Sequence, residues 1–131
     1  MSTGHEKLSA QELVRVGVWL LGAEVNNGGF DQYYFNSAGE LALPTVGALR
    51  TIAAERTADV LSMANSKFPN FSPLEQRIMR QEQLREIRDV AKFNALDDEF
   101  FQEQDDRTSL LAVSLKSMQA EYAEARVRPQ R

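Results

Sequence analysis

The chain has 131 residues, 43% of them apolar, and its 15 basic and 19 acidic side chains give a formal net charge of -4. This length suffices for one domain with its own hydrophobic core, so we expect a single domain over 1–131 with flexible ends at 1–8 and 127–131. The absence of cysteine excludes a disulfide scaffold and a zinc–thiolate module, and a pI near 5.0 argues against a surface devoted to nucleic acid.

The N-terminal segment does not have the features of a secretory signal. Residues 1–7 are polar and charged, whereas a signal peptide has a basic patch followed by an apolar run. The longest apolar stretch, 16–23, is interrupted by two glycines and is far shorter than the roughly 20 residues of a membrane-spanning helix. We therefore expect a cytoplasmic protein that does not contact a membrane.

The first predicted element is a central helix. Ser9 and Glu12 have the spacing of a capping box, in which each side chain accepts a hydrogen bond from the backbone amide of the other residue. Apolar residues then follow on two adjoining stripes as far as Val25, too wide an arc for a surface helix. The sequence Asn-Asn-Gly-Gly at 26–29 is expected to end this helix, because Asn and Gly tolerate the left-handed conformation.

The next elements are also predicted to be helical. Residues 30–37 should form a short helix with three aromatic rings along one side. Residues 40–68 should form helix with a break at 54–57. A second capping box with proline at the first helical position, 72–75, predicts a helix that continues to about Lys92.

The C-terminal third completes the predicted fold. Residues 97–104 should form a short acidic helix, and Asp105 and Asp106 are expected to cap a last helix whose apolar stripe runs over 111–125. No segment alternates apolar and polar residues between turn signals as a strand would. The expected fold class is therefore all-α, a single compact bundle of about six helices.

Few residues offer catalytic chemistry. His5 is the only histidine and lies in a polar end segment, so no catalytic triad is expected, and we predict neither a metal nor a cofactor. An alternative remains open because Glu24, Asp31 and Glu40 flank the Asn-Gly turn. If they converge, they would form the acid–base or metal-binding site of a small hydrolase or metal-binding protein. The nearby amides, interpreted as partners of helix ends, are Asn26, Asn27, Gln32 and Asn36.

Charge is unevenly distributed along the chain. Residues 73–92 are nearly balanced, residues 107–131 are basic, and residues 93–106 carry six acidic side chains and no basic one. The acidic stretch is either a solvated, helix-capping segment or a docking surface for a basic partner. A second alternative is direct nucleic-acid binding through the basic tail and the arginines of 77–88, namely Arg77, Arg80, Arg85 and Arg88.

Residues 24–39 resemble the signature of a bacterial helical family named after a DNA-mimic protein. In that family a helix ends in an Asn-Gly-Gly-Phe turn, and a Gln-Tyr-aromatic-Asn-Ser helix follows. A weaker likeness continues over 49–54, where the family often has Ile-Gly-Ala and this chain has Ala53 in place of the glycine. The matching signature residues are Asn27, Gly28, Gly29, Phe30, Gln32, Tyr33, Phe35, Asn36, Ser37 and Gly39.

The resemblance implies an all-α domain without known catalysis. For the founding type it also implies a dimer whose acidic surface imitates the DNA backbone and occupies the DNA-binding face of a transcription regulator. We interpret the signature itself as structural, so that mimicry would reside in surface carboxylates. We therefore predict a non-enzymatic domain that binds a protein, such as a DNA-binding regulator, and does not bind nucleic acid directly. The predicted acidic face consists of Asp97, Asp98, Glu99, Glu103, Asp105 and Asp106.

Overall fold

The structure is a computed structural model that describes residues 8–127. This part of the chain is all-α and contains no strand, as expected. His5 and the predicted flexible residues 1–7 and 128–131 lie outside the described part of the chain. The elements are α1 (Ala10–Glu12), the π-helix η2 (Leu13–Val18), α2 (Trp19–Phe35), the 3-10 helix η3 (Ser37–Leu41), α3 (Ala42–Thr51), α4 (Glu55–Asn65), the 3-10 helix η4 (Pro69–Phe71), α5 (Arg77–Ala91), α6 (Asn94–Gln102) and α7 (Gln104–Val127).

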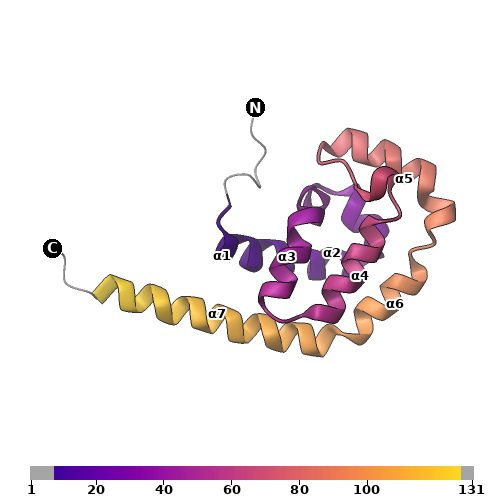
Figure 1. Ribbon diagram of the computed structural model, residues 1–131. Helices are drawn as coiled ribbons and strands as arrows, with labels where there is room; N and C mark the ends of the chain where they lie inside the picture. Colours follow the sequence, from indigo (N-terminus) through magenta and orange to yellow (C-terminus); the bar gives the residue numbers. More distant parts are fainter. Residues whose placement is uncertain (1–7, 128–131) are drawn as a thin grey trace.

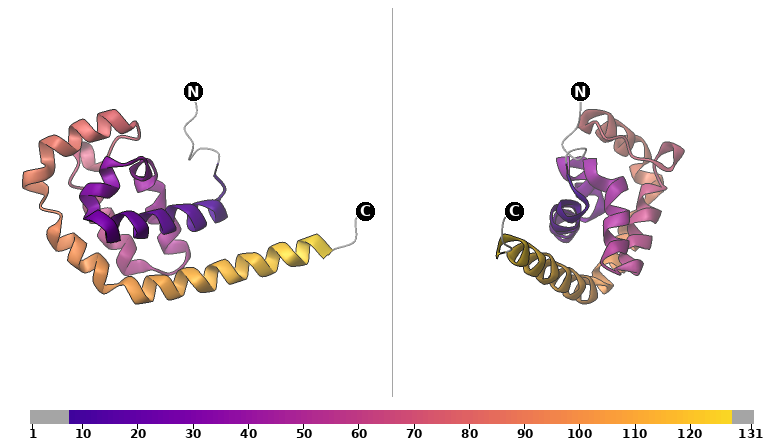
Figure 2. Two further views of the ribbon diagram at one scale, coloured as in Figure 1. Left: turned by 180° about the vertical axis from the view of Figure 1, so that it is seen from behind. Right: turned by 60° about the vertical axis from the view of Figure 1, so that its left-hand side comes forward.

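The helices form a compact body from which α7 extends (Figure 1). The helices α2, α3 and α4 lie at the centre, and α5 and α6 run around one side of them (Figure 2). With 24 residues, α7 is about 36 Å long, and its C-terminal half reaches beyond the body. Among the helices of residues 8–127, none has both the length and the apolar character needed to cross a membrane.

The first helix begins where the sequence predicts. Ser9 Oγ accepts from Glu12 N at 3.1 Å and Glu12 Oε1 accepts from Ser9 N at 2.9 Å, so the capping box is formed. The backbone amide of Ser9, which donates to the carboxylate, and the neighbouring Ser9 side chain lower the pKa of Glu12. The helix continues without interruption through η2 into α2, and Gly17 permits close packing on α3, because a Cβ there would lie 2.7 Å from Thr45 Oγ1.

An aromatic cluster forms the centre of the core. Phe30, Tyr33 and Tyr34 are fully buried, as the predicted ring stripe requires. Tyr34 contacts Phe68 with ring centroids 4.6 Å apart, and Phe30 meets Phe100 edge to face at 5.7 Å. The cluster therefore joins α2 to the end of α4 and to α6, and it holds together segments that are far apart in sequence.

The break in the 40–68 region lies at 52–54, so it overlaps the predicted position, 54–57, only at Ala54, and 55–57 form the first turn of α4. Ala53 adopts the left-handed conformation with φ 66°. Its amide donates to Arg50 O, and the next amide donates to Leu49 O, which is the Schellman arrangement. Position 53 is therefore one that favours glycine, the residue that the resembling family often has there.

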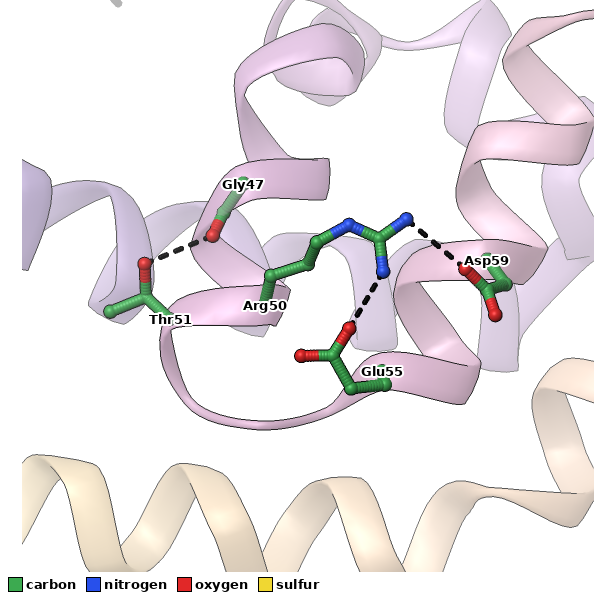
Figure 3. A network of polar contacts seen from close by, with 5 residues as sticks. All are labelled: Gly47, Arg50, Thr51, Glu55 and Asp59. Carbon is green, nitrogen blue, oxygen red and sulfur yellow. Dashed lines mark hydrogen bonds and ion pairs between the residues drawn. The ribbon is translucent and has the colours of Figure 1, made fainter.

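Arg50 supports the same turn from outside (Figure 3). Its Nη1 is 2.8 Å from Glu55 Oε1 and its Nη2 is 3.1 Å from Asp59 Oδ1, which connects the end of α3 to the start of α4. All three side chains are exposed, so these pairs contribute little to stability. Thr51 Oγ1 donates to Gly47 O within α3.

The second predicted capping box is wrong. The α5 helix begins at Arg77 and not at Pro73, and its N-cap is Gln76, whose side chain accepts from Met79 N. The carbonyls of Leu74 and Glu75 instead accept from the guanidinium of Arg80. Arg80, whose guanidinium is also held by Tyr34 O and Asn36 O, thus takes the backbone groups that the local pattern assigned to a helix.

The C-terminal helices follow the prediction with three differences. The short acidic helix predicted at 97–104 is α6, which covers Asn94–Gln102. Asp105 and Asp106 lie in the first turn of α7, which begins at Gln104, so neither precedes the helix as its cap. The regular apolar stripe of α7 is only partly covered, since Leu111, Leu115 and Met118 are half-buried and Tyr122 is 64% exposed.

Candidate functional site

The Gly-Gly step breaks the backbone of α2 without separating its two halves. Gly28 has φ -154° and ψ 20°, and Gly29 has φ 75°, so the expected helix end is a kink inside one element. After the kink, the amide of Phe30 donates to Asp97 Oδ1 at 2.9 Å. Burial raises the pKa of Asp97, and the hydrogen bond from Phe30 opposes this shift. Asp97 therefore acts as a cap supplied by α6 for the second half of α2.

A ladder of hydrogen-bonded polar side chains connects the residues before the kink to the residues after it. Glu24 Oε1 accepts from Gln32 Nε2 at 3.2 Å and from Asn36 Nδ2 at 2.7 Å. Gln32 Oε1 in turn accepts from Asn27 Nδ2 at 3.3 Å. The amides Asn27, Gln32 and Asn36 bond other side chains and not the helix ends predicted for them. Their role is still structural, because each of these hydrogen bonds ties a residue before the kink to one after it.

Arg80 holds the end of α2. Its side chain is fully buried, and its guanidinium donates to Tyr34 O and Asn36 O at 2.7 Å each. Two further donors reach Leu74 O and Glu75 O. Burial lowers the pKa of Arg80. One side chain thus satisfies four backbone carbonyls that two chain segments leave without partners.

Gly39 belongs to the same arrangement. A Cβ at this position would lie 2.7 Å from Arg80 Nε and 2.9 Å from Tyr33 O. The signature glycine is therefore explained by the space that the buried guanidinium occupies. Sequence reasoning missed the role of Arg80, which it grouped with the other arginines of 77–88 as a candidate nucleic-acid contact, and nothing in the local pattern distinguishes it from them.

Buried hydroxyls complete the region. Tyr34 Oη donates to Asn65 Oδ1 at 2.6 Å, and Asn65 Nδ2 donates to Ala42 O at 3.0 Å. The hydroxyls of Tyr33 and Thr45 are buried, and neither forms a well-aligned hydrogen bond in the described part of the chain, although Thr45 lies close enough to Tyr33 to oppose the rise in its pKa. Burial raises the pKa of both tyrosines, so both stay protonated at neutral pH. No ionisable nucleophile results from this arrangement.

The three carboxylates of the hydrolase or metal-binding alternative have separate partners. Glu24 belongs to the polar ladder, and Asp31 pairs with Arg88 at 2.5 Å. Glu40 contributes to the field around Arg80. Within residues 8–127, no group of three Asp, Glu, His or Cys side chains is placed to hold a metal ion.

The arginines of 77–88 also have partners within the chain. Arg77 Nε donates to Phe35 O, Arg85 pairs with Glu82, and Arg88 pairs with Asp31. Because Arg80 is buried as well, this helix presents few unpaired cations to a phosphate backbone, which disfavours the nucleic-acid alternative.

The acidic segment 93–106 divides into two kinds of side chain. Asp97 is half-buried as the cap of Phe30, and Glu103 is half-buried with its Oε2 3.6 Å from Arg56 Nη1. The other four are exposed and form no ion pair within residues 8–127; we call them the exposed acidic set, and they are Asp98, Glu99, Asp105 and Asp106.

A cleft of about 280 Å³ lies between α4 and α6, next to this set. Glu99, Glu103 and Asp59 supply carboxylates to its lining, and Val60 and Met63 supply apolar surface. The acidic segment therefore borders a hollow with both polar and apolar walls.

Comparison with protein-family models matches residues 6–125 to the family described as DMP19-like protein. The matched range includes the Gly-Gly kink, the acidic segment and most of α7. No curated protein and no solved structure matches the chain.

Proposed function

Because the chain belongs to the DMP19-like protein family, we propose that it is a non-enzymatic interaction domain of the DNA-mimic type. In this proposal it occupies the DNA-binding face of another protein, such as a transcription regulator, in the cytoplasm. The exposed acidic set, Asp98, Glu99, Asp105 and Asp106, is the part that contacts the partner.

The observation that carries the proposal is the free charge of that set. Asp98 and Glu99 lie on α6, and Asp105 and Asp106 lie in the first turn of α7. Their carboxylates are exposed and without ion pairs among the described residues, and the stretch 93–106 contains no lysine or arginine. A DNA-binding face recognises rows of negative charge, so these carboxylates offer the same electrostatic contacts as phosphates.

The size of the set limits the proposal to one region. The net charge of the chain is only -4, and most other carboxylates near it are paired with arginine. We therefore propose a local imitation of the DNA backbone and not a molecule that imitates DNA over its whole surface. A homodimer, which the family resemblance implies, would present two such regions, and light scattering coupled to size-exclusion chromatography tests it.

The test uses immobilised full-length chain to capture proteins from native cytosol, followed by a competition assay. A captured DNA-binding protein is loaded with labelled duplex DNA, and addition of the chain is expected to release the DNA. The variants D98N/E99Q and D105N/D106N each remove two free charges and are expected to need about tenfold more protein for release at low salt.

The matched control is E86Q/D89N, which removes two exposed charges from α5. It is expected to release DNA like the original chain, and added salt should weaken release by the original chain. If the four acidic substitutions leave the competition unchanged, or if the control is weakened equally, the proposed face is wrong.

A further inference from the structure

A second cleft lies between the N-terminal helix and the first turns of α7. Its volume is about 290 Å³, and its apolar walls include Val18, Trp19 and Leu111. Small-molecule sites begin at about 300 Å³, so the space suits a small ligand. The two helices run side by side in both views of Figure 2, and Gln11 Nε2 donates to Glu121 Oε1 at 3.3 Å farther along them.

Arg107 lines this cleft as a buried cation that forms no ion pair among the described residues, and the charge of Glu103 acts on it only through space. Its side chain is 4% exposed, its guanidinium carbon lies 3.7 Å from the centroid of the Phe100 ring, and its Nη1 donates to Phe100 O. No carboxylate among the described residues forms an ion pair with it. Burial lowers the pKa of Arg107 to about 10, so it remains protonated at neutral pH.

Most N–H donors of Arg107 are left without an acceptor among the described residues. A guanidinium has five N–H donors, and only one from Arg107 has an acceptor in the described part of the chain. A buried charge is costly until an opposite charge pairs with it. An anion that enters the cleft would therefore gain charge-assisted hydrogen bonds that the chain itself does not supply.

The remaining lining favours an apolar body on that anion. The indole of Trp19 is 62% exposed beside the cleft. Gly22 forms part of the lining, and no heavy atom lies within 4 Å of where its Cβ would be. A glycine inside a helix is less favourable than alanine, and here it leaves the cleft open along α2.

We infer that this cleft binds a small amphipathic carboxylate, whose anionic group pairs with Arg107 and whose apolar part lies between Trp19 and Leu111. A carboxylate matches the planar fork of a guanidinium in two parallel hydrogen bonds. The inference does not rest on the proposed function, because no member of the exposed acidic set lines this cleft.

The test titrates the full chain with octanoate and, separately, with 1-octanol, which has the same chain length and no charge. Trp19 is the only tryptophan, so its emission reports directly on the cleft. Octanoate is expected to produce a saturable blue shift and to bind about tenfold more tightly than octanol, because of its charge-assisted hydrogen bonds.

Three variants define the site. G22L should fill the cleft and weaken octanoate binding at least tenfold, whereas G47L, whose glycine also faces open space but lies on α3, should bind like the original chain. R107M should bind octanoate and octanol equally. If R107M does not fold, G22L and the comparison of the two ligands still decide the question.

Two outcomes would overturn the inference. Equal affinity of the original chain for octanoate and octanol would show that no cation selects the anion. An unchanged octanoate titration in G22L would place the bound ligand elsewhere on the surface. Neither outcome would change the result of the DNA-competition assay, so the ligand inference and the proposed function can fail separately.

Discussion

The segment 24–39 and the helix α7 have opposite relations to the rest of the molecule. The segment is rich in amides and glycines, yet Asp97, Arg80 and Asn65 contact it from three other helices. The α7 helix has the more regular apolar stripe, yet much of that stripe stays half-exposed. An apolar pattern therefore shows which face of a helix prefers contact, whereas the number of satisfied backbone groups shows how firmly a segment is held.

The largest expected effect is at Arg80. R80M removes the donors of four carbonyls, at Leu74, Glu75, Tyr34 and Asn36, and should lower the free energy of unfolding by about 3–5 kcal/mol. Urea denaturation measures the loss. R85M on the same helix removes only an exposed pair with Glu82 and should cost below about 1 kcal/mol. Similar losses for the two variants would contradict the special role of Arg80.

A matched pair of valines compares the two regions directly. Val25 is fully buried in the segment, and Val113 is 67% exposed on α7. V25A should cost about 2 kcal/mol through lost burial and an unfilled cavity, whereas V113A should change stability by less than about 0.5 kcal/mol. Thermal unfolding of both variants measures this difference, and a larger cost for V113A would reverse the comparison.

The cap at the kink should have a smaller effect. D97A leaves the amide of Phe30 without its acceptor and should cost about 1–2 kcal/mol, whereas D97N keeps an oxygen there and should cost less. Denaturant unfolding of the two variants at one pH gives the difference. Equal costs would show that the hydrogen bond to Phe30 contributes nothing.

The same residue predicts a pH dependence. Burial raises the pKa of Asp97 in the folded state above its unfolded value near 3.9. The neutral form is thus favoured by folding, so this contribution to stability is complete below the unfolded pKa and is lost as the pH rises through the folded pKa. D97N lacks the titrating group, so the stability of the original chain relative to D97N should fall across that range.

The smallest effect concerns the turn after α3. Ala53 has φ 66°, a conformation that costs a residue with a Cβ about 1 kcal/mol, and Gly29 meets the same requirement with glycine. A53G should therefore stabilise the chain by up to about 1 kcal/mol in thermal unfolding. A53V should destabilise it, and stabilisation by both variants would rule out relief of backbone strain as the cause.

The fold class was predictable because it depends on local patterns. The capping box at Ser9, the Gly-Gly step and the ring spacing of Phe30, Tyr33 and Tyr34 each act within a few residues. The helix start at Pro73 was mispredicted because the carbonyls of Leu74 and Glu75 accept from Arg80. Local helix propensity does not reveal that Arg80 supplies these donors, because its guanidinium is positioned by contacts with the end of α2.

The candidate sites show the same division. The sequence alone indicates an all-α chain, an acidic stretch at 93–106 and a motif whose residue types suit helix ends. Only the tertiary structure separated Asp97 and Glu103, which are held by Phe30 and Arg56, from the exposed acidic set. Only it buried Arg80 among carbonyls and left Arg107 beside a cleft without an ion pair in the described part of the chain. The physical reason is that pairing and desolvation depend on neighbours far apart in the chain, which residue type and spacing do not specify.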